Sequence, residues 1–202
     1  MNQAEQAAYL AVTEMIESGV TPNGAARGEL GLREPDSFDQ RRLLTEAMAR
    51  LSRASSIDEL VTVLRECARK IARCDGVTVI RREGNLVAYI AEDALTPLWT
   101  GERFPIENCI SGLAIIEARP IHIPDIYDDP RVPVDAYRPT FVRSMSMFPI
   151  GLMGPSMAMG AYWAEAGPAD PTVTALLGSL ARYAGVTLGR VTEGRGADPT
   201  AS

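Results

Sequence analysis

Cys109 is the residue whose type and position could most directly do chemistry. It stands immediately before residues 110–118, which are predicted to form a short helix that ends at Arg119-Pro120. The positive end of a helix dipole favours a thiolate, so this sulfur could act as a nucleophile or a redox sensor. The alternative is a half-buried cysteine that only packs ahead of the helix. Cys67 and Cys74 fall on or after the inward stripe of another predicted helix, which indicates core positions.

His122 is the only histidine, so it alone could be a general base or a haem ligand. It lies in a strand-like run between Ile121 and Ile123, and β alternation turns it to the face opposite these isoleucines. If the isoleucines belong to the core, His122 faces a pocket or solvent. The alternative is a strand residue without a function. A single histidine excludes metal sites that need several histidines.

Asp125, Asp128 and Asp129 are close enough in sequence to suggest a divalent cation site. Their spacing lacks the glycine and the distant glutamate of a calcium-binding loop. Aspartate also accepts hydrogen bonds from nearby backbone N–H groups. We therefore interpret Asp128-Asp129-Pro130 as a turn or a helix cap.

Composition excludes several classes of protein. The chain has 202 residues, 46% of them hydrophobic, with a net charge of −6, which argues against nucleic-acid binding. No apolar run approaches the roughly 18 to 20 residues that span a bilayer. The N-terminus lacks the basic region of a secretory signal. The three cysteines have no CxxC spacing, so neither a disulfide framework nor a zinc site is indicated. A cytoplasmic protein without a membrane or nucleic-acid partner is expected.

The chain divides into four predicted segments. Residues 1–18 carry a helical apolar stripe, which Gly19 ends. Residues 19–36 contain four glycines and two prolines and are predicted to form a linker. Residues 37–192 form the predicted domain. Residues 193–202 are small and polar, which predicts a disordered tail.

Within the domain, helices and strands alternate in a recognisable order. A first helix is capped at Asp36 or Ser37 and runs to about Arg53, and Ser56 with Glu59 forms a capping box for a second helix. Two β-rich runs surround Glu83-Gly84-Asn85, which indicates a hairpin. The later elements are strands at Ile121–Ile123, Ser144–Ile150 and 157–164, and a helix from Asp170-Pro171 to about Val191. This order predicts an α+β domain with an antiparallel sheet.

Residues 104–151 and the strand after them carry a resemblance to a known family. The phrases CISG, PDIYDDPRVPVDAYRPTFVRS and GAYWAE resemble a GAF domain, a PAS-like sensor module. The likeness covers about residues 38–192 and is greatest to GAF domains N-terminal to bacterial sensor histidine kinases of the HWE or HisKA-2 type. It implies a central antiparallel sheet with helices on one face and a loop-covered pocket on the other.

The resemblance also implies where a ligand would bind. The floor would be the strands at 144–150 and 157–164, and the walls residues 109–141. Aromatic rings and guanidinium groups there could hold a planar or anionic ligand, although the same residues could serve packing alone. Met145 and Met147 are expected to face the pocket, with Ser146 and Phe148 toward helices or solvent. The candidate pocket residues are Trp99, Cys109, Tyr127, Tyr137, Arg138, Arg143, Met145, Met147 and Met159.

The resemblance implies a cytosolic sensory module of a two-component system that signals through its terminal helices. The apolar stripes of these helices predict a homodimer. A histidine kinase or another signalling protein is a possible partner, but the chain has no phosphoacceptor histidine motif and no ATP-binding glycine boxes, so no catalysis is expected from it. Whether it belongs to a longer kinase or stands alone remains open, as does the identity of any small-molecule ligand.

Two alternatives within the family are a bilin photoreceptor and a Cys109-based redox sensor or reductase. Bilin-carrying GAF domains usually place a histidine after the attaching cysteine, where this chain has Ile110. Reductases of the family would have a second cysteine near residues 135–137, and none is present. The cyclic-nucleotide signature of GAF domains is missing too. No cofactor is predicted.

Overall fold

The computed structural model describes residues 34–152 and 154–196 of the chain. The predicted N-terminal helix (residues 1–18), most of the predicted linker (19–36) and the end of the predicted tail (197–202) lie outside the described residues.

A single six-stranded sheet forms the centre of the domain, in the order β3-β2-β1-β6-β5-β4, and every neighbouring pair is antiparallel. The short strand β3 was not predicted from the sequence. Gly84 has a φ of 65° in the β1–β2 turn, which explains why this hairpin needs glycine there. The strands are β1 (Gly76–Glu83), β2 (Leu86–Ala94), β3 (Arg103–Pro105), β4 (Ile121–Ile123), β5 (Ser144–Ile150) and β6 (Met157–Trp163).

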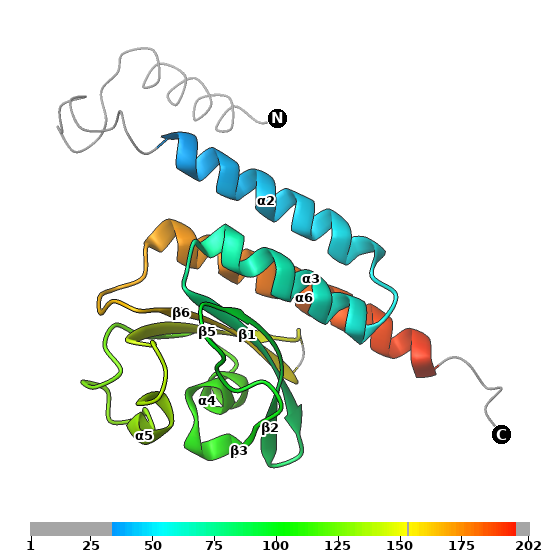
Figure 1. Ribbon diagram of the computed structural model, residues 1–202. Helices are drawn as coiled ribbons and strands as arrows, with labels where there is room; N and C mark the ends of the chain where they lie inside the picture. Colours follow the sequence, from blue (N-terminus) through cyan, green and yellow to red (C-terminus); the bar gives the residue numbers. More distant parts are fainter. Residues whose placement is uncertain (1–33, 153, 197–202) are drawn as a thin grey trace, which may run out of the picture. The chain divides into compact units, whose positions relative to one another are not determined.

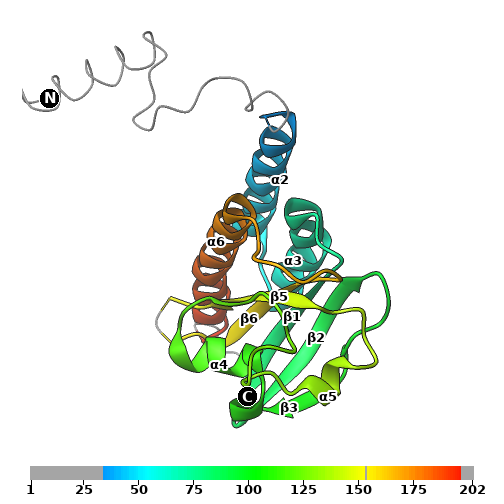
Figure 2. The ribbon, with the colours of Figure 1, turned by 90° about the vertical axis from the view of Figure 1, so that its left-hand side faces the viewer.

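Helices cover both faces of this sheet (Figures 1 and 2). One face is covered by the long helices α3 (Ile57–Ala72) and α6 (Pro171–Gly196), and α2 (Glu34–Arg53) packs on the outer side of these two helices (Figure 1). The other face carries a 3₁₀ turn (Ile106–Asn108), α4 (Ile110–Glu117) and α5 (Val134–Tyr137), together with the loops between them. The α+β architecture predicted from the sequence is confirmed.

Local signals set the helix ends, with small differences from the prediction. Ser56 caps α3 as predicted, because its Oγ accepts a hydrogen bond from the Glu59 N–H at 3.2 Å. The Glu59 carboxylate, however, accepts from the backbone N–H of Ser55 rather than that of Ser56. Helix α2 begins at Glu34, before the expected cap, and α6 continues to Gly196, so residues 193–196 of the predicted tail are helical.

Two hydrophobic cores lie on opposite faces of the sheet. The helix-side core is formed by α2, α3, α6 and strand residues such as Val79, Phe148 and Met159. The loop-side core lies under α4 and α5 and includes Met145 and Met147. Alternation along β5 therefore places the two methionines opposite Phe148, as predicted.

Candidate functional site

Four aromatic side chains occupy the space where the resemblance predicted a ligand pocket. The Trp99 ring lies 4.9 Å from the Tyr137 ring, and 5.5 Å from the rings of both Tyr89 and Tyr162, all in edge-to-face arrangements. All four side chains are buried. We call Tyr89, Trp99, Tyr137 and Tyr162 the aromatic cluster. It fills the centre of the loop-side core.

The polar atoms of the aromatic cluster have partners inside the protein. The Tyr162 hydroxyl lies 2.8 Å from Thr78 Oγ1, and the Tyr89 hydroxyl lies 3.1 Å from Ser111 Oγ. Trp99 Nε1 donates to the carbonyl of Ala136 at 3.2 Å. Burial raises the pKa of both tyrosine hydroxyls, so they stay protonated. Among the residues that the structure describes, no buried side-chain nitrogen or oxygen lacks a partner.

Glu92 on β2 holds the loop that carries Trp99. Its carboxylate accepts hydrogen bonds at 3.0 Å from the backbone N–H groups of Leu98, Trp99 and Thr100. Charged acceptors make strong hydrogen bonds with backbone donors. The indole is therefore held in the cluster by the loop backbone as well as by ring packing.

Cys109 lies beside this cluster, at the N-cap of α4, and is only 5% exposed. Its thiol is within 3.6 Å of the Pro105 carbonyl, and the Ser111 hydroxyl donates to its sulfur at 3.4 Å. Burial raises the pKa of the Cys109 thiol, so the effect of desolvation exceeds that of the hydrogen bonds. The geometry therefore favours a neutral packing thiol over the thiolate that the helix position suggested.

Gly112 and Gly160 make this close packing possible. A Cβ on Gly112 would lie 1.8 Å from the Ile106 carbonyl oxygen, so only glycine lets α4 approach the 3₁₀ turn. A Cβ on Gly160 would lie 2.5 Å from the Tyr162 hydroxyl. The glycines of CISG and GAYWAE thus serve the interior packing of the loop-side core.

Three of the predicted wall residues are on the surface, so their placement in a pocket wall is wrong for this structure. Arg143 forms a bidentate ion pair with Asp125, at 3.0 and 2.7 Å, and its guanidinium lies 4.8 Å from the Tyr127 ring centre. Arg138 pairs with Asp135 at 2.9 Å, and both side chains are well exposed. These groups therefore pair with one another at the protein surface and do not face the aromatic cluster.

Met159 is also not on the face that the sequence reasoning gave it. It pairs with Phe148 in the β5–β6 register, and cross-strand partners share a face. Phe148 belongs to the helix-side core, so Met159 does too. Of the nine candidates, Trp99, Cys109, Tyr137, Met145 and Met147 come together in the loop-side core.

The aspartates next to β4 serve the local backbone. Asp125 accepts a hydrogen bond from the Tyr127 N–H, and Asp129 accepts one from the Arg131 N–H, both at 3.0 Å. The predicted turn is confirmed. Arginine partners lower the pKa of both carboxyl groups. Over residues 34–152 and 154–196, no group of three or more His, Cys, Asp or Glu side chains could hold a metal ion.

His122 lies on the opposite face from Ile121 and Ile123, as alternation predicted. Its Nδ1 is 2.9 Å from the hydroxyl of the fully buried Ser146, and its ring is 5.8 Å from that of Phe148. Burial lowers the pKa of His122, which favours the neutral ring. The single histidine therefore lies on the helix side of the sheet. In the part of the chain that the structure describes, no hydrogen bond joins it to Cys109.

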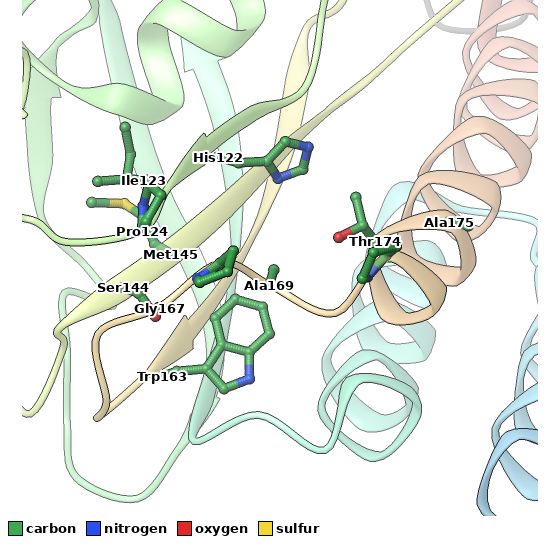
Figure 3. Close-up of a pocket in the computed structure, with 12 residues that line it drawn as sticks. His122, Ile123, Pro124, Ser144, Met145, Trp163, Gly167, Ala169, Thr174 and Ala175 are labelled. Atoms are coloured by element: carbon green, nitrogen blue, oxygen red, sulfur yellow. The ribbon is translucent and has the colours of Figure 1, made fainter. Parts of the chain in front are cut away.

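His122 borders an open cleft between the sheet edge and the start of α6. The cleft has a volume of about 480 Å³. Figure 3 shows the His122 ring extending from β4 toward Thr174 of α6, with Trp163 at one end of the space. Two prolines contribute to its walls: Pro124, which directly follows β4, and Pro171, the first residue of α6. We call this the edge cleft.

Helix α6 connects the sheet to α2. Gly185 lies against the β5–β6 turn, where an added Cβ would be 3.0 Å from the Gly151 nitrogen. Near the C-terminal end of α6, Arg190 donates to the carbonyls of Leu51, Ser52 and Ala54 at 3.3, 3.2 and 2.7 Å. The last carbonyls of a helix have no N–H of a following turn to accept from, so side chains of another helix can bond them. The arginine therefore ties the end of α2 to α6.

Sequence reasoning missed several of these residues. Tyr89 and Tyr162 occupy ordinary apolar positions of predicted strands, so nothing in their spacing marked them. Trp163 could have been noticed, because a large ring at the end of the last strand precedes the loop before α6. Arg190 could not have been noticed, because its partners are more than a hundred residues away in sequence.

Comparison with known proteins identifies the fold. The GAF domain of a phosphoenolpyruvate-protein phosphotransferase from Coxiella burnetii is 14% identical, with a TM-score of 0.69; the match covers 81% of this chain and 99% of that one. Free methionine-R-sulfoxide reductase from Neisseria meningitidis, solved with its substrate, is 14% identical, with a TM-score of 0.67 and coverages of 79% and 93%.

A third similar structure is the chromophore-binding domain of a bacteriophytochrome from R. palustris. It is 16% identical, with a TM-score of 0.64; the match covers 78% of this chain and 63% of that one. No protein-family model and no curated protein matches the sequence. The structural likenesses show that the domain has the GAF fold. None of the helices in its described part is long and apolar enough to cross a membrane.

Proposed function

We propose that this GAF domain is a sensory and regulatory module of bacterial signal transduction. It binds a small molecule or a partner protein and passes its state through α2 and α6. The observation that carries the proposal is the junction of these helices, because Arg190 of α6 bonds the last carbonyls of α2. A shift of the sheet under α6 would move both helices together.

The similar structures include both a bacteriophytochrome domain and a reductase, so the absence of catalysis is argued from the residues of this chain. The thiol of Cys109 is buried and held neutral. His122, the one histidine, lies on the other face of the sheet. A nucleophile and a base on opposite faces cannot act on one substrate.

The redox and bilin alternatives have direct tests. The protein is incubated with free methionine-R-sulfoxide and dithiothreitol, and methionine formation is measured beside a Cys109→Ser variant. We expect no turnover from either. Turnover that Cys109→Ser abolishes would overturn the sensor proposal in favour of a reductase. Visible absorbance of protein purified from its native host would instead support a chromophore.

The signalling route is tested by a thermal-shift screen of metabolites, followed by hydrogen exchange on each compound that stabilises the protein. We expect such a compound to change exchange in the last turn of α2 and in α6. Compounds that bind but change exchange only at their own contacts would contradict the proposed route.

We also propose that the module acts as a homodimer, with a histidine kinase of the HWE or HisKA-2 type as the output partner. The resemblance of the sequence to GAF domains of such kinases supports the second part. Large apolar side chains on the outer helices support the first: Phe38 of α2 is 70% exposed and Val186 of α6 is 52% exposed. Light scattering should report a dimer, and a monomer at high micromolar concentration would refute it.

A further inference from the structure

We propose that the edge cleft is a binding site for a neutral, planar aromatic molecule that carries one hydrogen-bonding group. The site lies on the helix side of the sheet, apart from the aromatic cluster. This inference is independent of the proposed signalling role, since the cleft can bind such a molecule whether or not the domain is a sensor.

The size and shape of the edge cleft suit a small molecule. Its volume of about 480 Å³ falls within the roughly 300 to 1,000 Å³ that is typical of small-molecule sites. Most of its lining is apolar, and the half-buried Trp163 ring presents a flat surface at one end (Figure 3). An indole beside open space favours a planar aromatic partner, because two rings can stack or meet edge to face.

The charge of the lining selects a neutral molecule. No Asp, Glu, Lys or Arg is among the described residues that line the cleft. The adjacent N-terminus of α6 offers little to an anion, because the Asp170 side chain already accepts from the Thr172 N–H at 2.7 Å. A charged molecule would lose its hydration in the cleft without gaining an opposite charge.

His122 supplies the fixed polar group. Its Nδ1 is engaged by the Ser146 hydroxyl at 2.9 Å, which sets the orientation of the ring and leaves Nε2 as the other polar atom. Burial of part of the ring lowers its pKa, which favours the neutral form. Either tautomer offers one hydrogen bond at Nε2, as donor or acceptor, and a hydroxyl on the bound molecule matches both.

Naphthol, naphthalene and naphthalenesulfonate form a probe set for this chemistry. They share a planar ring system and differ in the hydroxyl and in the charge. Titrated into the full chain, naphthol should bind saturably with one site. Naphthalene should bind roughly ten-fold more weakly, since losing one hydrogen bond costs up to about 1.4 kcal/mol. Naphthalenesulfonate should bind at least roughly ten-fold more weakly, because its charge finds no opposite charge in the cleft. Equal affinity for all three, or no naphthol binding, would overturn the proposal.

The position of the probe is read from the two tryptophans of the chain. Each gives one indole N–H resonance, and a Trp163→Phe variant assigns them. Naphthol should shift the Trp163 signal and leave that of Trp99, whose N–H is bonded to Ala136, unchanged. A shift of Trp99 alone would place the probe in the loop-side core and refute the site.

Ala175→Trp is the blocking variant. Ala175 is exposed on α6 and lines the cleft, so a large ring there fills the space without removing any core contact. Naphthol affinity should fall at least ten-fold. Ala49→Trp, at an exposed position of α2 outside the lining, is the matched control and should bind as wild type does. Unchanged affinity in Ala175→Trp would overturn the proposal.

His122→Leu tests the hydrogen bond separately. Its affinity for naphthol should fall to that for naphthalene, while its affinity for naphthalene stays the same. A folded His122→Leu protein that still prefers naphthol would show that the histidine does not recognise the hydroxyl. His122→Asn, which keeps a polar group beside Ser146, serves as a second variant if the leucine variant does not fold.

Discussion

The aromatic cluster and the edge cleft each contain one of the two tryptophans, and they are built in opposite ways. Trp99 is buried among three tyrosines, its N–H is bonded, and a carboxylate holds its loop. Trp163 is half-buried and borders open space. The resemblance to GAF domains predicted a pocket in the first region, yet the side chains of the aromatic cluster occupy this space. The location of a pocket in a fold therefore does not decide whether a particular chain keeps it open.

The largest expected effect comes from removing each tryptophan in turn. Trp99→Ala should lower the free energy of unfolding by about 3 to 5 kcal/mol, as for large rings lost from a core. Trp163→Ala, at the open cleft, should cost clearly less. Urea unfolding measures both. Equal losses of unfolding free energy in the two variants would contradict the view that Trp99 lies in a filled region and Trp163 beside an open one.

Arg190→Ala tests whether the helix side of the domain is held together at the α2–α6 junction. The loss of three hydrogen bonds to carbonyls should cost about 1 to 2 kcal/mol and speed amide exchange in the last turns of α2. Arg182→Ala is the matched control, because Arg182 donates to the Ser179 hydroxyl of its own helix. If amide exchange in the last turns of α2 is the same in both variants, the Arg190 hydrogen bonds do not hold the end of α2 in place.

Thiol reactivity tests how tightly the loop-side core is closed. Burial raises the pKa of all three cysteines, to about 12 for Cys74, and Cys67 is the most exposed of them. Iodoacetamide should therefore modify Cys67 first and reach Cys109 only in urea. Cys109→Ser should cost about 1 kcal/mol. Rapid labelling of native Cys109 would show that the core opens.

The smallest expected effect is a pH dependence at the edge cleft. Burial lowers the pKa of His122 below its usual 6.5, so the folded state binds this proton less readily than the unfolded state does. The contribution of the neutral ring to stability is fully present above pH 6.5 and is lost as the pH falls from there through the lower pKa of the folded state.

His122→Asn cannot titrate, so its stability relative to wild type should improve as the pH is lowered from about 8 to about 5. Carboxyl groups such as those of Glu66 and Asp125 have lowered pKa values, so their effect on stability falls at a lower pH than that of His122. Urea unfolding at a series of pH values measures the difference. A constant difference between the two proteins would mean that His122 is as solvated as in the unfolded chain.

Local features of the fold could be predicted from the sequence, because they depend on a few neighbouring residues. Ser56 caps α3, Gly84 makes the hairpin turn, and His122 points away from Ile121 and Ile123. Caps, positive φ angles and strand alternation follow from backbone geometry alone. The GAF fold followed from the order of these elements and from the resemblance.

The state of each candidate site was decided only by tertiary structure. Alternation could not place Met159, because the face of β6 depends on its register with β5. Trp99 and Tyr137 fill the expected pocket, and Arg143 pairs with Asp125 outside it. Whether a space is filled depends on the summed volumes of side chains from distant segments, since protein interiors pack to a fixed density. The sequence therefore determined the scaffold, while the packing of residues far apart in the chain decided which of its hollows remain open.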